Sequence, residues 1–225
     1  MLINLTIIVT FLVYLNLLLA ILGLGLYAKL RPTQKSYKYL FAYIFYSIIS
    51  DLIFSKLSIK YLESEIYSFR LYTIVEYTLL TLAIKEHIKS QMILKFIYTF
   101  SFLFYCLAFF DSILGKISQF DSLPAGFESI LLLVYSLFFI YEKVINNTLN
   151  FNGFTWVVIG LIIAFSGTFF LFILTQKNFE NQVFIITYGY IVAIFNIIKF
   201  TFLSIGIYTE NKKMISINHN SLIKI

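Results

Sequence analysis

The sequence contains few of the residues from which metal and nucleophilic sites are usually built. It has one cysteine, Cys106, and two histidines, His87 and His219, among 225 residues. A single cysteine excludes a disulfide within the chain and a thiolate metal cluster. Neither histidine lies within an apolar run, so a zinc site or a serine–histidine pair at membrane depth would have no imidazole. We therefore predict no metal site and no cofactor.

Enzyme motifs are also missing. The chain has no Walker loop and no HExxH sequence, and we assign no catalytic residue. A chemistry based on carboxylates alone stays open, because small membrane lipid hydrolases of that kind exist and Asp51, Glu76 and Glu128 lie in apolar segments. We expect no nucleic acid as a partner.

Charge is scarce throughout the chain. Charged residues make up 12% of it, whereas hydrophobic residues make up 60% and aromatic residues 20%. Soluble domains carry roughly twice this share of charge, and so few polar side chains cannot cover a surface exposed to water. The composition therefore predicts a protein of the inner (plasma) membrane.

Seven apolar stretches have about the 20 residues that a helix needs to cross the hydrocarbon core. Transmembrane strands would instead show short segments of alternating polarity. We predict an all-α, polytopic membrane protein: a bundle of about seven transmembrane helices in a domain at 1–208, with a short cytoplasmic tail at 209–225. The predicted spans are about 3–28, 39–59, 66–84, 92–110, 124–141, 154–176 and 182–207.

Lysine and arginine predict the orientation, because positive loops stay in the cytoplasm. The even-numbered loops with their flanks hold Lys56, Lys60, Lys116 and Lys177. The odd-numbered loops and the tail hold Lys29, Arg31, Lys35, Lys38, Lys85, Lys89, Lys95, Lys143, Lys212, Lys213 and Lys224. The N-terminus is therefore expected outside and the C-terminus inside. The tail is too short for an output domain, so any signal must pass to a partner or act through the membrane.

Ionisable residues within the spans are the clearest pointers to function, because a charge at the bilayer centre costs a few kcal/mol or more. In the second span, Tyr43, Ser47, Asp51 and Ser55 recur at every fourth residue and share one helix face. This stripe predicts either a polar seam that joins helices or the wall of a ligand or ion cavity.

The third span contains Arg70 and Glu76, which are six residues apart, point in different directions and need separate partners. Arg70 and Glu128 enter the membrane from the same side to a similar depth, so we predict an Arg70–Glu128 pair near the outer surface, with Asp51 as another partner for Arg70. Glu76 falls near mid-membrane, where a lone carboxylate must be paired or protonated. It is the best single candidate for a functional residue.

The last span contains Lys199, with Asn196 one turn before it. A lysine in a seventh helix invites comparison with the microbial rhodopsins, but no acidic residue stands one turn before Lys199 and the chain has a single tryptophan, Trp156. Its ammonium group could also reach the cytoplasmic surface. The predicted ligand-binding or polar seam thus consists of Asp51, Arg70, Glu76, Glu128, Asn196 and Lys199.

Three stretches carry a family resemblance: LYTIVEYTLL with Glu76, FESILLLVYSLFFIYE with Glu128, and IGLIIAFSGTFFLFIL with Ser166 and Gly167. The chain resembles a loose group of uncharacterised seven-helix membrane proteins of Bacteroidetes-type bacteria. Genes of this group often neighbour sensor histidine kinases, and the resemblance implies a sensing or accessory role.

Three functions follow from these observations. The leading hypothesis is a sensor or receptor-like module that detects a small apolar ligand or the membrane state and signals through a separate partner, for which a sensor histidine kinase is expected. The second is a small transporter or proton-coupled carrier. An inverted repeat with broken helices would support this hypothesis, and the sequence shows neither feature. The third is a membrane-embedded lipid-modifying enzyme. Membrane lipids are expected partners in each case.

Overall fold

The computed structural model describes the backbone of residues 2–30, 32–57, 62–114, 122–146, 152–178 and 182–222, and side chains over somewhat narrower ranges. These residues form seven helices, and none of them forms a strand. The all-α prediction is therefore confirmed. The helices are α1 Leu2–Leu30, α2 Lys35–Leu57, α3 Leu62–Lys85, α4 Gln91–Leu114, α5 Ser122–Ile145, α6 Gly153–Asn178 and α7 Gln182–Leu222.

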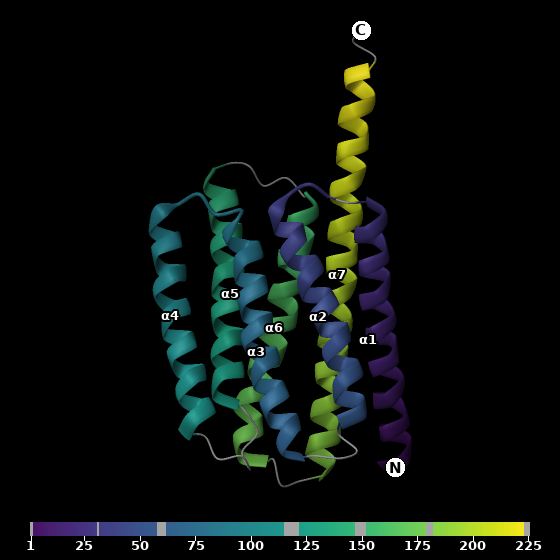
Figure 1. Ribbon diagram of the computed structural model, residues 1–225, viewed down its shortest axis with the longest axis vertical. Coiled ribbons are helices and arrows are strands. Elements are labelled where there is room, and N and C mark those ends of the chain that lie inside the picture. The colour runs from purple at the N-terminus through teal and green to yellow at the C-terminus, as the bar shows by residue number, and fades with distance from the viewer. Residues whose placement is uncertain are drawn as a thin grey trace.

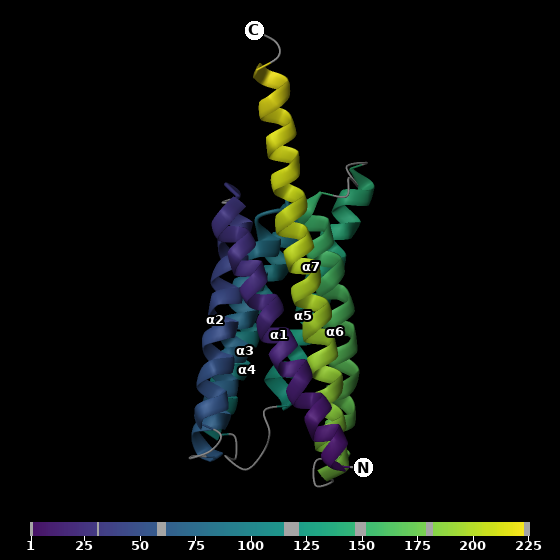
Figure 2. The same cartoon turned by 90° about the vertical axis from the view of Figure 1, so that its right-hand side faces the viewer.

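The helices stand side by side in one bundle (Figures 1 and 2). Each helix contacts the next one along the chain, from α1 with α2 to α6 with α7, and α1 also contacts α7. The contacts therefore close the seven helices into a ring, within which α3 also touches α5. Short connections between antiparallel neighbours favour such a sequential arrangement.

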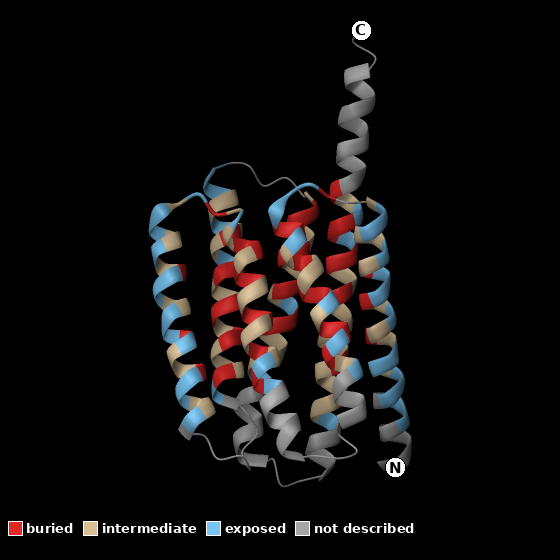
Figure 3. Ribbon diagram, viewed as in Figure 1, coloured by how far each residue is buried: buried red, intermediate tan, exposed pale blue. Residues whose placement is uncertain are grey.

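Apolar side chains lie both inside the bundle and on its outer surface. Large rings such as those of Tyr43 and Phe139 are fully buried in the core. On the outside, α1 and α4 are largely exposed (Figure 3), with Phe11 65% and Phe102 68% accessible. An apolar outer surface of this extent is unfavourable in water and suits contact with lipid.

Within the described residues, five segments are long and apolar enough to cross a membrane: Thr10–Leu30, Gln91–Ile113, Leu123–Ile145, Gly153–Leu171 and Thr187–Glu210. The chain is therefore a helical membrane protein. The helices α2 and α3 are not among the five: the described side chains of α2, at 35–52, include the charged Lys35, Lys38 and Asp51, and those of α3 cover only 69–85, which is too short a stretch. Both nevertheless stand within the bundle beside the apolar helices (Figure 1).

Every helix extends beyond its predicted span at one end or both, and two of these extensions change the interpretation of the sequence. The span 92–110 ended before Asp111, whereas α4 runs to Leu114 and includes this residue. The span 182–207 ended where the sequence becomes polar, whereas α7 continues to Leu222 and projects beyond the other helices (Figures 1 and 2). The segment predicted as a tail is thus mostly a continuation of α7. Hydropathy predicts where lipid contact ends, which differs from where a helix ends.

The backbones of α6 and α7 meet near the end of the bundle from which α7 projects. A Cβ atom at Gly206 would lie 2.7 Å from the carbonyl oxygen of Gly153. Only glycine leaves room for this approach, which small residues commonly provide between membrane helices. This close contact sets the position of α7 along its axis relative to α6, near the point where α7 begins to project.

Candidate functional site

The centre of the ring holds a buried ion pair between α3 and α7. The Lys199 Nζ atom lies 2.6 Å from Glu76 Oε1, and the two side chains are only 5% and 8% exposed. Lys199 is in the middle of the apolar segment Thr187–Glu210. The pair therefore joins two helices that are far apart in the sequence, at a depth where water is scarce.

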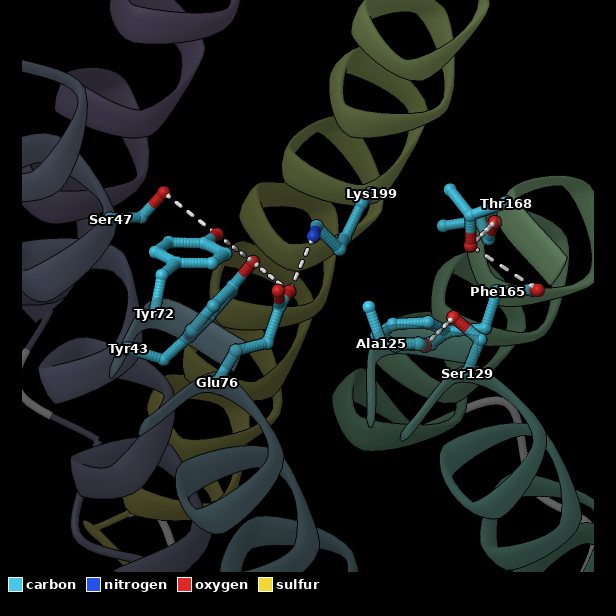
Figure 4. A network of polar contacts seen from close by, with 10 residues as sticks. Tyr43, Ser47, Tyr72, Glu76, Ala125, Ser129, Phe165, Thr168 and Lys199 are labelled. Carbon is cyan, nitrogen blue, oxygen red and sulfur yellow. Dashed lines mark hydrogen bonds and ion pairs between the residues drawn. The ribbon is translucent and has the colours of Figure 1, made fainter. Parts of the chain in front are cut away.

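Hydroxyl groups from α2 and α3 extend this pair into a network (Figure 4). The Tyr43 hydroxyl donates a hydrogen bond of 2.8 Å to Glu76 Oε1. The Tyr72 hydroxyl lies 3.5 Å from that of Tyr43 and 3.4 Å from Ser47 Oγ. Glu76 Oε1 thus accepts from both a lysine and a tyrosine, which is the kind of additional bonding that a buried ion pair needs to offset its loss of hydration.

Aromatic rings surround the ammonium group of Lys199. Its Nζ atom lies 5.4 Å from the ring centroid of Tyr43, 5.6 Å from that of Phe165 and 5.8 Å from that of Phe200. Tyr43 and Phe200 stack with an interplanar angle of 6°. A cation within about 6 Å of an aromatic face is attracted by the ring quadrupole, and the attraction is stronger when water is excluded. The cage therefore stabilises the charged lysine on the sides that Glu76 does not cover.

The predicted stripe on α2 reaches this network. Tyr43 and Ser47 both take part in it, and the half-buried Asp51 lies within electrostatic range of Lys199, which attracts its carboxylate, and of Glu76, which repels it. The side chain of Ser55 lies outside the described residues. Two described members of the stripe, Tyr43 and Ser47, thus join the network directly, whereas Asp51 is linked to Glu76 and Lys199 through its charge.

The alternative that the Lys199 ammonium group reaches the cytoplasmic surface is not what the structure shows. The ammonium group points toward Glu76 (Figure 4) and is almost fully buried. Hydropathy places both residues in helices but does not give the direction in which their side chains point, so the pair could not be identified from the sequence. Asn196 is half-buried one turn earlier on α7.

Arg70 has a different partner from the predicted one. Its Nη2 atom lies 3.2 Å from Asp111 Oδ2, with both side chains mostly buried, whereas the sequence predicted Glu128 or Asp51. The physical reason is the length of α4: the predicted span ended at residue 110 and left Asp111 in a loop, but the helix continues and places this carboxylate beside α3. Glu128 is buried in α5.

A second group of polar contacts lies where α7 leaves the bundle. Gln34 Nε2 donates to Glu210 Oε1 at 2.7 Å, and the Tyr37 hydroxyl donates to the Gly206 carbonyl at 3.4 Å. Both contacts come from the start of α2 or just before it. They hold α7 immediately before its projecting segment, and hydropathy gave no signal for them.

His87, in the connection between α3 and α4, lies near this end of the bundle. Its Nε2 atom is 2.9 Å from Ser36 Oγ, and its ring stacks on Phe154 at 3.8 Å. Burial, reinforced by the nearby charge of Lys143, lowers the pKa of His87 to about 4. The imidazole is therefore neutral at pH 7 and acts as a packing residue.

Among the described residues, no group of three or more histidine, cysteine, aspartate or glutamate side chains is placed to hold a metal ion. Comparison with known protein families, curated proteins and solved structures gave no match for this chain.

Proposed function

We propose that the protein is a membrane sensor or receptor-like module whose buried Glu76–Lys199 pair responds to a small apolar or amphipathic ligand, or to the membrane state. The observation that carries the proposal is the course of α7: one continuous helix holds Lys199 in the pair and then projects beyond the bundle to Leu222. The sensing residue and the projecting segment are therefore parts of the same rigid element.

The geometry of α7 supports transmission of a signal. Lys199 and Leu222 are 23 residues apart, which corresponds to roughly 35 Å of helix. Between them, Gly206 and Glu210 contact Tyr37 and Gln34. If α7 rotates or tilts when the pair opens, these contacts must rearrange, and the projecting segment moves with them.

The topology of the proposal follows the distribution of lysine and arginine. All seven helices cross the inner membrane, with the N-terminus outside and the C-terminus in the cytoplasm. The projecting part of α7 then lies in the cytoplasm, where a separate sensor histidine kinase is the expected partner. The side-by-side packing of α2 and α3 with the five apolar segments supports the seven-span count.

A ligand can shift α7 only if it binds the state with the open pair more tightly than the state with the closed pair. The site offers chemistry for such a preference. The aromatic rings around Lys199 provide apolar contact, while Glu76 and the Tyr43 hydroxyl provide polar groups. An amphipathic molecule that hydrogen-bonds to Glu76 would compete with Lys199 for the carboxylate.

Purification of the intact protein from native membranes, with mass spectrometry of the proteins and lipids that remain bound, tests whether a partner exists. We expect a histidine kinase to co-purify with the full chain and to be lost when residues 211–225 are deleted. If no protein co-purifies but a lipid or small molecule is retained, the proposal is rejected and flux or lipid-turnover assays become the relevant tests.

Electron–electron distance measurements test whether the pair controls α7. Spin labels are attached at E86C and N218C in a Cys106→Ser background, and the distance distribution is compared with and without Glu76→Gln. We expect this substitution to shift or broaden the distribution. Asp111→Asn is the matched control, because it breaks a buried pair that joins α3 to α4 and leaves α7 untouched. Equal effects of the two substitutions, or no effect of Glu76→Gln, would contradict the proposed coupling.

A further inference from the structure

A cavity lies at the end of the bundle from which α7 projects, between the connection 86–90 and the end of α5. Its volume is about 600 Å³. Lys89, Ser90 and Lys143 contribute polar groups, and Ile93, Tyr141 and Ile145 contribute apolar surface. None of these residues takes part in the Glu76–Lys199 network.

We infer that this cavity binds the headgroup of an anionic phospholipid. The inference goes beyond the proposed sensing role and does not depend on it. Two lysines line the cavity, the exposed Lys89 and the half-buried Lys143. Lys143 Nζ is held 5.5 Å from the Phe139 ring centroid, so its position is partly fixed before a ligand arrives.

The other ionisable groups that line the cavity leave it positively charged. The Glu142 carboxylate accepts hydrogen bonds from the backbone N–H groups of Lys89 at 2.8 Å and of Ser90 at 3.4 Å. It is therefore engaged in holding the connection 86–90 against α5. His87 is neutral at pH 7, because its pKa is lowered to about 4. The lining thus carries two positive charges and one negative charge.

The apolar lining favours a lipid over a soluble anion. Tyr141 and Ile145 are each 59% exposed, and Met92 and Val144 nearby on α4 and α5 are 83% and 53% exposed. A headgroup phosphate beside the two lysines would place its acyl chains along these outward-facing apolar side chains. Lysines at the cytoplasmic surface of a membrane attract anionic lipids, and the lysine distribution assigns this end of the bundle to the cytoplasm.

Native mass spectrometry of the full-length protein tests the inference, with phosphatidylglycerol, phosphatidylcholine and inorganic phosphate as separate probes. We expect saturable binding of phosphatidylglycerol, which has a net negative charge, and much weaker binding of zwitterionic phosphatidylcholine. Replacing both cavity lysines by Lys89→Gln and Lys143→Gln should weaken phosphatidylglycerol binding about tenfold or more.

The matched control is the double substitution Lys38→Gln and Lys95→Gln, which removes the same charge from exposed lysines that do not line the cavity. It should retain phosphatidylglycerol binding within about twofold. Equal losses in the two double variants would show general attraction to a basic surface and overturn the site. If inorganic phosphate displaced bound phosphatidylglycerol as effectively as an equal concentration of competing phosphatidylglycerol does, the choice of a lipid would be overturned. Because all four lysines are at or near the surface, unchanged thermal unfolding should accompany each variant.

Discussion

Replacing Lys199 by methionine should strongly destabilise the protein, because the change leaves the Glu76 carboxylate buried without its cation. Methionine keeps the length and the contact with the rings of Phe165 and Phe200, so the lost charge is the main perturbation. Removing one partner of a buried ion pair typically costs about 3–5 kcal/mol. The 2.6 Å separation and the near-complete burial of both side chains place this pair within that class.

The double substitution Glu76→Leu with Lys199→Met distinguishes the effect of the two charges from the effect of side-chain packing. Removal of both charges leaves no buried ion without a partner, and apolar replacements of buried pairs are often neutral or stabilising. The double variant should therefore recover most of the stability that Lys199→Met loses. The measurement is the free energy of unfolding in mixed micelles, from reversible denaturation followed by circular dichroism. Lys95→Met, at an exposed lysine of α4, is the control and should change the free energy by no more than about 0.5 kcal/mol.

Two results would show that Glu76 and Lys199 do not form a buried, interacting pair. A loss below about 1 kcal/mol in Lys199→Met would mean that the lysine is solvated in the folded state, since exposed pairs contribute at most this amount. A double variant whose loss equals the sum of the two single losses would mean that Glu76 and Lys199 do not interact, because contacting residues show a coupling energy.

Substitutions at Tyr43, Gly206 and His87 should each have a measurable effect. Tyr43→Phe should lower the free energy of unfolding by about 1.5–3 kcal/mol, since the hydroxyl donates to a charged acceptor; a loss equal to that of Tyr72→Phe would contradict the assignment of Tyr43 as the direct donor. Gly206→Val should impair the approach of α7 to α6, because the new side chain would meet the backbone of Gly153, and a cysteine cross-link between the two helices would then form more slowly. His87→Gln should make stability less sensitive to acid. The folded state holds the pKa of His87 near 4, below the usual histidine value of 6.5. The unfolded state therefore binds the proton more readily between these values, and the wild type loses stability as the pH falls through this window. Parallel stability curves for wild type and variant, in unfolding assays from pH 7 to about 4, would disprove this account.

The number of helices was predictable from the sequence. Hydropathy places a residue along the membrane normal because lipid contact depends on composition over about 20 residues. For this reason each predicted span coincides with a helix, and Glu76, which the sequence predicted to need a partner or a proton, is buried with a partner.

The pairing of the charged residues was not predictable by the same means. Which side chains meet depends on how each helix is rotated about its axis and on which helices are neighbours, and average hydropathy contains neither. The partner of Arg70 was missed for another reason: hydropathy ended the predicted span at residue 110, so Asp111 was assigned to a loop and not to α4. The projecting part of α7 illustrates a third, since a polar helix outside lipid has no hydropathy signal.

The charges on α3 explain both why this helix is a poor span by composition and why it is well placed in the bundle. Arg70 and Glu76 point in directions roughly 120° apart around the helix, and each finds an opposite charge on a different neighbour, Asp111 on α4 and Lys199 on α7. Two such contacts on different faces fix the rotation of α3, which a uniformly apolar helix would leave to packing alone. Their net stabilisation is small, because desolvation offsets most of the attraction, so we infer that they define the arrangement more than they strengthen it. Opening the pair would leave two buried charges without partners, so only a ligand that itself bonds to Glu76 or Lys199 can shift the equilibrium toward the open state, and this requirement would make the site selective.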